Sequence, residues 1–388
     1  MYFRKILSVM SVSCLLFLLA CGPKPVAPKA ELDTPEHHVT NGNKLLKAGK
    51  IDKAFKEFNR AKLLDPEYSP AYVGLGLVCG LKGDFKKGFA SMDKAENYAK
   101  GKKQAVTVNV GYMRLYIMGK EKVDKDWLDE VEDYHKDATK LAPDCPEPYY
   151  YMGIAYKMSY NFQKAAKQFT KVLDLDMGFV EEADNEYAII QKIERAMPGT
   201  SVGKKIALLE KITRADIAAL FIEELRVDEL FANRTPKEFD TSFKSPEKEF
   251  KTGEYIKIPP ATDIADHVLK ADIDAVIEIG IKGLQPYPDH TFKPYEMINR
   301  AEFAMMIEDI LIKITGVEEL ATRFIGSVSP FSDLRNDLPY FNAVVLCTTR
   351  GIMVAKDLRS GEFDAMGNVS GAEALLSLRV LKTQLQKY

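Results

Sequence analysis

The chain has 388 residues, of which 46% are hydrophobic and 28% are charged, with a formal net charge of −2. This length predicts two or three domains that each bury a core. The near-neutral charge gives no electrostatic case for nucleic-acid binding. The five His residues are scattered along the chain without metal-ligand spacing, so we predict neither a metal site nor a cofactor.

The N-terminus carries an export signal. Arg4 and Lys5 precede an apolar run that ends at Cys21, a pattern typical of a signal peptide over residues 1–20. The sequence "LLAC" at 18–21 resembles the bacterial lipobox, which implies that Cys21 is lipidated and becomes the first residue. Two or more acyl chains, at about 0.8 kcal/mol per buried CH₂, would hold such a protein stably at a membrane. A plain signal peptide or an uncleaved membrane helix is the alternative.

The residues after Cys21 extend this interpretation. Residue 22 is Gly rather than Asp, which by resemblance to lipoproteins of two-membrane bacteria favours the outer membrane over the inner one. Residues 21–34 are rich in Pro and read as an extended tether. Cys79, Cys145 and Cys347 form no CxxC motif, and their odd number prevents complete pairing. We predict that these three cysteines are buried, unreactive thiols.

A period of 34 residues follows the tether. Three sets of residues carry it at the same internal spacing: Gly42, Leu45, Ala54, Phe58 and Ala61; Gly76, Cys79, Gly88, Met92 and Ala95; Gly153, Tyr156, Ala165, Phe169 and Val172. The pattern resembles the tetratricopeptide repeat. This resemblance implies about four helical hairpins over residues 35–180, stacked into a solenoid with a concave face that binds a protein partner.

The third copy of the repeat and the tyrosines of residues 149–156 are less regular than the rest of the pattern. Residues 105–143 resemble a degenerate third copy, in which "GKEKVDKDW" lengthens the link between the helices. Tyr149 and Tyr156 fall at repeat positions that pack internally. Tyr150 and Tyr151 are candidates for contact with a protein partner, although no sequence feature decides between core and groove for them.

After about residue 181 the period changes. The segments "ITRADIAALF" (212–221), "INRAEFAMMI" (298–307) and "VSGAEALLSL" (369–378) each predict a helix start. Each carries the capping-box spacing, in which two side chains satisfy backbone N–H groups of the first turn. The pairs are Thr213 with Asp216, Asn299 with Glu302, and Ser370 with Glu373. The intervening residue is Arg214, Arg300 or Gly371. Because the helix dipole disfavours a cation there, the two arginines need another explanation.

These segments, with the loop "GLQPYPDHTFKP" before the second, resemble the S-layer homology module. The resemblance covers residues 181–388, with an insertion at about 225–260, and implies a three-copy, mostly helical domain. That family uses the Arg to bind anionic cell-wall polysaccharide. The resemblance therefore assigns glycan binding to Arg214 and Arg300, with Asp289 orienting the guanidinium or contacting sugar hydroxyls. The alternative is an Arg paired with a neighbouring acid. Gly371 lacks the guanidinium, so at most two of three pockets are competent.

Three classes of function follow from these features. The first is an envelope lipoprotein that links a membrane to anionic wall polysaccharide or peptidoglycan and docks a protein through its repeats. The second is an assembly or secretion accessory lipoprotein whose C-terminal domain is only a scaffold. An enzyme has little support, because no nucleophile–base motif or metal cluster is present. The stretch "GTSVGKK" at 199–205 lacks the phosphate-loop pattern.

Overall fold

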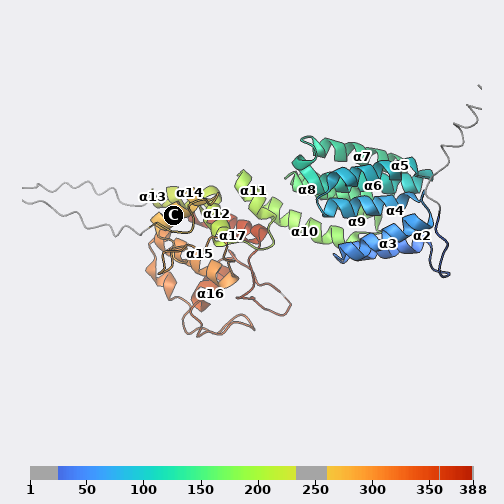
Figure 1. The fold of residues 1–388 in the computed structure, drawn as a ribbon. Coiled ribbons are helices and arrows are strands. Elements are labelled where there is room, and N and C mark those ends of the chain that lie inside the picture. Colours follow the sequence, from blue (N-terminus) through green and yellow to red (C-terminus); the bar gives the residue numbers. More distant parts are fainter. Residues whose placement is uncertain (1–24, 233–259, 358, 387–388) are drawn as a thin grey trace, which may run out of the picture. The chain divides into compact units, whose positions relative to one another are not determined.

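The computed structural model describes residues 25–232, 260–357 and 359–386. These residues are mainly α-helical (Figure 1), as the sequence predicts, and their β-structure is limited to isolated bridges. The chain divides into two compact units, Met1–Tyr187 and Ala188–Tyr388. The predicted signal peptide, Cys21 and most of the predicted insertion lie outside the described residues. None of the described helices combines the length and apolar character that a membrane-spanning helix needs.

The described part of the first unit consists of four helical hairpins followed by the first half of α10 (Val180–Ala196), within which the unit ends at Tyr187. The hairpins pair α2 (Pro35–Lys47) with α3 (Ile51–Leu64), α4 (Ser69–Leu81) with α5 (Phe85–Asn97), α6 (Gly101–Gly119) with α7 (Trp127–Leu141), and α8 (Pro146–Met158) with α9 (Phe162–Leu175). A 3₁₀ turn, η1 (Lys120–Lys122), lies in the link between α6 and α7. The first unit therefore has a tetratricopeptide-like fold.

The repeated glycines explain how the helices of a hairpin pack. A Cβ added to Gly42 would lie 2.5 Å from the ring of Phe58, and one added to Gly153 would lie 2.6 Å from the ring of Phe169. Both rings are fully buried. Each large residue stands sixteen positions after its glycine, so the glycine on the first helix makes room for the aromatic side chain of the second.

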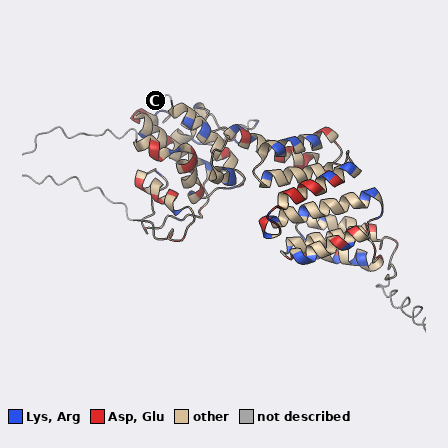
Figure 2. Ribbon diagram, turned by 90° about the horizontal axis from the view of Figure 1, so that it is seen from above, with Lys and Arg blue, Asp and Glu red and all other residues tan. Residues whose placement is uncertain are grey.

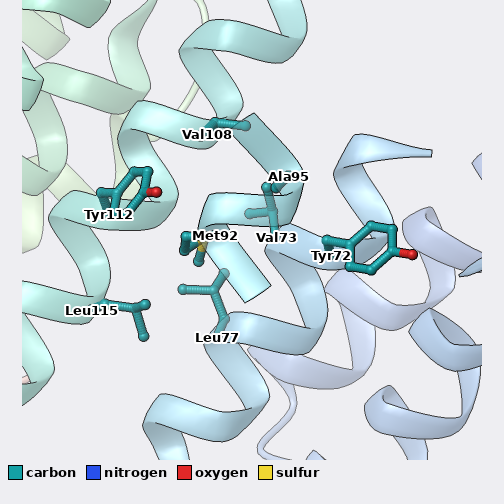
Figure 3. Close-up of a cluster of buried hydrophobic side chains, with 8 residues drawn as sticks. All are labelled: Tyr72, Val73, Leu77, Met92, Ala95, Val108, Tyr112 and Leu115. Atoms are coloured by element: carbon teal, nitrogen blue, oxygen red, sulfur yellow. The ribbon is translucent and has the colours of Figure 1, made fainter. Parts of the chain in front are cut away.

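Neighbouring hairpins pack against each other through buried apolar side chains. Figure 3 shows a buried cluster with Met92 of α5 in its middle and side chains of α4 and α6 around it. The cluster consists of Tyr72, Val73, Leu77, Met92, Ala95, Val108, Tyr112 and Leu115. Because it draws on two consecutive hairpins, their stacking buries apolar surface that neither would bury alone.

The second unit is built from short helices and long loops. Its described elements are α11 (Ser201–Ala207), α12 (Arg214–Leu220), a π-helical turn η2 (Phe221–Leu225), α13 (Val227–Ala232), α14 (Lys270–Ile279), α15 (Arg300–Thr315), a 3₁₀ turn η3 (Glu318–Ala321), α16 (Phe341–Thr349) and α17 (Gly371–Leu385). Helices α12, α15 and α17 begin at the three related segments found in the sequence.

These three segments meet in a closed ring of backbone hydrogen bonds. The Ile212 N–H donates to the Val369 carbonyl (3.0 Å), Ile298 N–H donates to Ile212 (3.0 Å), and Val369 N–H donates to Ile298 (3.2 Å). All three side chains are buried. The three copies are therefore arranged cyclically, so that each copy has one neighbour on either side.

Candidate functional site

The N-terminal ends of α12 and α15 carry the predicted capping boxes. In α12 the Thr213 N–H donates to Asp216 (2.8 Å), and in α15 the Asn299 N–H donates to Glu302 (3.0 Å). In α17 only half of the box forms: Ser370 Oγ accepts from the Glu373 N–H (3.3 Å). The prediction of a third capping box is wrong, because the Glu373 carboxylate pairs with Arg300 instead.

Arg300 is an internal link between the second and third copies. Its Nε donates to the Phe363 carbonyl (2.8 Å), its Nη2 donates to the Val354 carbonyl (2.6 Å), and its Nη1 pairs with Glu373. The guanidinium also lies over the Phe363 ring, 4.4 Å from the centroid. The residue is only 1% exposed. Burial lowers its pKa, an effect that Asp364 and Asp333 oppose.

The predicted contact between Arg300 and an external glycan does not fit this geometry. A residue that is 1% exposed offers no donor to a ligand in solvent. The alternative of a neighbouring acid describes Arg300 better, with Glu373 as that acid. The cation at the helix start is thus compensated by carbonyls, a carboxylate and an aromatic face.

Arg214 makes the equivalent link from the first copy to the second. Its Nε donates to the Phe292 carbonyl (2.8 Å), Nη1 to Gly283 (2.5 Å) and Nη2 to Gln285 (3.1 Å). Its guanidinium lies 4.9 Å and 4.8 Å from the ring centroids of Tyr287 and Phe292. Arg214 also borders a pocket of about 380 Å³. The pocket is lined by Arg214, Lys282, Gly283, Gln285, Pro286, Tyr287, Pro288, Glu302, Met305 and Met306.

Asp289 does not orient the Arg214 guanidinium, contrary to the prediction. Its Oδ1 accepts hydrogen bonds from the Thr291 N–H (3.0 Å) and hydroxyl (2.6 Å), which lower its pKa and hold the turn. The acid that approaches the Arg214 guanidinium is Glu296, at 3.9 Å from Nε. Asp289 is exposed and does not line the pocket. Its structural role is therefore to shape the loop.

Sequence reasoning missed the two aspartates that hold the loops. Asp263 accepts from the backbone N–H groups of Phe292 (2.7 Å) and Lys293 (2.8 Å). Asp333 accepts from those of Phe363 (2.8 Å) and Asp364 (2.7 Å) in the same way. The available signal was the spacing, since each Asp precedes its buried aromatic residue by 29 or 30 positions.

Gly371 occupies the position of the two arginines in the third copy. A Cβ at Gly371 would lie 1.7 Å from the carbonyl oxygen of Ile206, at the end of α11. The Gly371 N–H donates to Leu209 (2.9 Å). The backbone at the end of α11 and directly after it therefore fills the space that an Arg side chain would need, and the glycine follows from this close approach.

A second candidate site lies in the first unit. The first helix of every hairpin contributes to a groove of about 710 Å³, as do residues at the start of α10. Its lining residues are Val39, Asn43, Leu46, Lys47, Pro70, Val73, Gly74, Leu77, Leu81, Thr107, Val110, Gly111, Arg114, Glu147, Tyr150, Tyr151, Gly178, Phe179 and Glu182. We call this feature the repeat groove.

Tyr150 and Tyr151 both line the repeat groove. The Tyr150 ring stacks on Phe179 with centroids 4.9 Å apart, and the Arg114 guanidinium lies 4.9 Å from the Tyr151 centroid. Burial raises the pKa of Tyr150 to about 12 and also raises that of Tyr151. Tyr149 instead donates its hydroxyl to the Pro143 carbonyl (3.0 Å). Adjacent tyrosines of α8 thus face different surroundings.

The stretch 199–205 has no free donors for a phosphate at its start. The N–H groups of Gly199 and Thr200 both donate to the Glu224 carboxylate (3.0 Å each), and the Thr200 hydroxyl donates to it as well (2.8 Å). An acidic side chain therefore occupies the place that an anion would take.

The cysteines outside the signal region are unpaired in the described structure. Cys347 is fully buried, and burial raises its pKa. Cys79 and Cys145 are partly buried, with pKa values raised for the same reason. Within the described residues no cluster of His, Cys, Asp and Glu side chains has the geometry to hold a metal ion.

Comparison with known proteins adds little. No family model matches the chain, and no curated protein matches it. A solved structure described as "Functional Characterization of Pseudomonas Aeruginosa pilF" is 13% identical, with a TM-score of 0.23. That similarity covers 43% of this chain and 93% of the other chain. Superposition this poor supports no argument, so the helical hairpins themselves carry the assignment of a tetratricopeptide-like fold.

Proposed function

We propose that the mature protein is an envelope lipoprotein whose helical repeats dock a protein partner. The observation that carries this proposal is the repeat groove, to which all four described hairpins contribute. Partly exposed apolar and aromatic side chains in a long groove suit a peptide segment of another protein.

The proposed location rests on the sequence alone. The lipobox-like run ending at Cys21 would place acyl chains at the N-terminus, and the Pro-rich residues 21–34 would join it to the repeats. The described end of this segment contacts the first hairpin, since the Val26 N–H donates to the Leu63 carbonyl (2.8 Å) and Asp33 accepts from Arg60 Nε (3.0 Å). Gly22 favours the outer membrane in this proposal. A lipid anchor confines the repeats to the membrane surface, which raises the effective concentration of any partner held there.

Site-specific photo-crosslinking tests the docking function. A benzophenone amino acid in place of Asn43 or Thr107, which line the groove, should yield an adduct with one protein in intact cells. The same probe in place of Lys94, an exposed residue of α5 that does not line the groove, should yield none. Leu81→Glu, which places a charge at an exposed groove position, should reduce the Thr107 adduct at least severalfold. Equal adducts from Asn43, Thr107 and Lys94 would contradict groove docking.

A second candidate function is binding of an anionic wall glycan in the second unit. The supporting observation is the pocket of about 380 Å³ beside Arg214, which exposed Lys282 also lines. Tyr287 offers a ring to a sugar at the same place. Arg300 has no part in this candidate, so one pocket rather than two supports it.

Lys282→Glu tests the glycan candidate, because the exposed Lys282 side chain lines the pocket and has no hydrogen bond or ion pair to lose among the described residues. Circular dichroism checks that the fold tolerates the new charge, since the charge of Lys282 acts on Glu308. Reversing an exposed charge at the pocket should weaken sedimentation with purified sacculi by about three- to tenfold. Lys356→Glu is the matched control, since this exposed lysine of the third copy lies outside the pocket. Equal losses in both variants would indicate nonspecific electrostatics and remove the candidate.

A further inference from the structure

The repeat groove combines apolar walls with charged side chains of both signs. Val39 and Leu46 of α2 and Pro70 and Leu81 of α4 supply apolar surface. Four charged residues, two basic and two acidic, lie in the same lining: Lys47, Arg114, Glu147 and Glu182. Figure 2 shows basic and acidic residues interspersed along the helices of this unit. The groove therefore has no excess of one charge, and its selectivity depends on which charges already have partners.

These four charges surround Tyr151. Burial is the main reason that the pKa of Tyr151 is raised, and Arg114, Glu147, Glu182 and Lys47 all act on its hydroxyl. Lys47 and Glu182 satisfy each other in an ion pair of 2.5 Å. Arg114 rests its guanidinium on the face of the Tyr151 ring. Three of the four charged side chains in the groove thus have a direct partner.

Glu147 is the exception. Among the described residues its carboxylate has neither a hydrogen bond nor an ion pair, although it lines the groove. Burial raises its pKa, and the charge of Arg114 only partly opposes that effect. The residue is half-buried, and a carboxylate that loses part of its hydration without gaining a partner is destabilised. A cation delivered by a ligand would remove that penalty.

We propose that the repeat groove binds an apolar peptide segment that carries a Lys or Arg side chain, and that Glu147 is the residue that pairs with it. This inference rests on the proposed docking function and adds the chemistry of the partner. The apolar walls receive the flanking side chains of the segment. Charge complementarity at Glu147 sets the position of its basic residue. An acidic segment would instead bring a second negative charge beside an unpaired carboxylate.

Selection from random peptides tests this inference without knowledge of the natural partner. The full mature chain is immobilised and panned with phage-displayed dodecapeptides, in parallel with Glu147→Gln and with Asp129→Asn as the control. Asp129 is an exposed acid on the outer helix α7. We expect the wild type and Asp129→Asn to select apolar peptides enriched in Lys or Arg at one position. Glu147→Gln should lose that basic preference and keep the apolar one.

Affinity measurements then assign the contact. For one selected peptide, fluorescence anisotropy should give a dissociation constant at least tenfold higher for Glu147→Gln than for the wild type. Replacing the basic residue of the peptide with Met should weaken binding to the wild type by a similar factor and leave binding to Glu147→Gln unchanged. Circular dichroism of Glu147→Gln, which is nearly isosteric with the wild type, checks that the fold is intact.

Other outcomes would overturn the inference in distinguishable ways. Apolar peptides without a basic preference, or a preference that persists in Glu147→Gln, would refute pairing at Glu147 and leave the docking function standing. Selection of acidic peptides would refute it too and would point to Arg114. Failure to select any peptide whose binding Leu81→Glu weakens would count against groove docking as a whole.

Discussion

Arg300→Met is expected to lower the stability of the C-terminal unit by about 3–5 kcal/mol, the usual cost of removing one partner from a buried ion pair. The change leaves the Glu373 carboxylate unpaired and removes the donors to the Phe363 and Val354 carbonyls. Arg300 is 1% exposed, so water cannot replace those contacts without opening the core. The variant therefore tests whether this Arg is a structural link rather than a glycan ligand.

The two units offer an internal control for this measurement. Urea unfolding followed by circular dichroism reports helix loss in the whole chain, whereas fluorescence of the single Trp127 reports the first unit. The dichroism midpoint for the second unit should fall, and the Trp127 midpoint should stay unchanged. Arg335→Met, which removes an exposed ion pair with Asp337, should cost less than about 1 kcal/mol.

A double variant distinguishes the cost of the unpaired Glu373 carboxylate from the cost of the lost packing of Arg300. Arg300→Met combined with Glu373→Gln should regain part of the loss, because the buried neighbourhood then holds a neutral amide instead of an unpaired carboxylate. Wild-type stability in Arg300→Met would mean that its internal contacts contribute nothing, and the structural assignment of Arg300 would be wrong.

Gly371→Ala is also expected to lower the stability of the second unit. Helix propensity alone favours Ala over Gly by about 1 kcal/mol within a helix. The tertiary structure predicts the opposite sign, because the new Cβ would lie 1.7 Å from the Ile206 carbonyl oxygen. Backbone cannot rotate out of the way as a flexible side chain can, so α11 must shift. Overpacking of this kind typically costs about 1–3 kcal/mol and occasionally more.

The same urea experiment measures this variant. The dichroism midpoint of the second unit should fall, and Gly371→Arg, which restores the residue of the other two copies, should lower it further. Trp127 fluorescence again serves as the reference for the first unit. A midpoint that rises on Gly371→Ala would show that helix propensity outweighs the contact with Ile206, against the explanation given for the third copy.

Local features of the fold could be predicted because short-range physics controls them. The 34-residue period places a glycine opposite a large residue within one hairpin, as Gly42 and Phe58 illustrate. A capping box joins two residues that are three positions apart, and two of the three predicted boxes form. The third fails for a nonlocal reason, since Arg300 competes for the Glu373 carboxylate.

The site could be predicted only in part. The sequence located Tyr150 and Tyr151 as candidates, and both line the groove. It left Glu147 unnoticed, because an acid in the first turn of a helix is ordinary. What distinguishes Glu147 is that it lines the groove and has no hydrogen bond or ion pair among the described residues, although burial raises its pKa.

By itself, the sequence determined that the chain is mainly helical and that its first part repeats every 34 residues, since helix capping and glycine–aromatic packing act over short spans. Only the tertiary structure decided what the arginines do. The carbonyls that receive the Arg214 guanidinium lie 69 to 78 residues away in the sequence. No local pattern encodes whether such distant groups satisfy a guanidinium or leave it open to a ligand, because burial is a property of the assembled core.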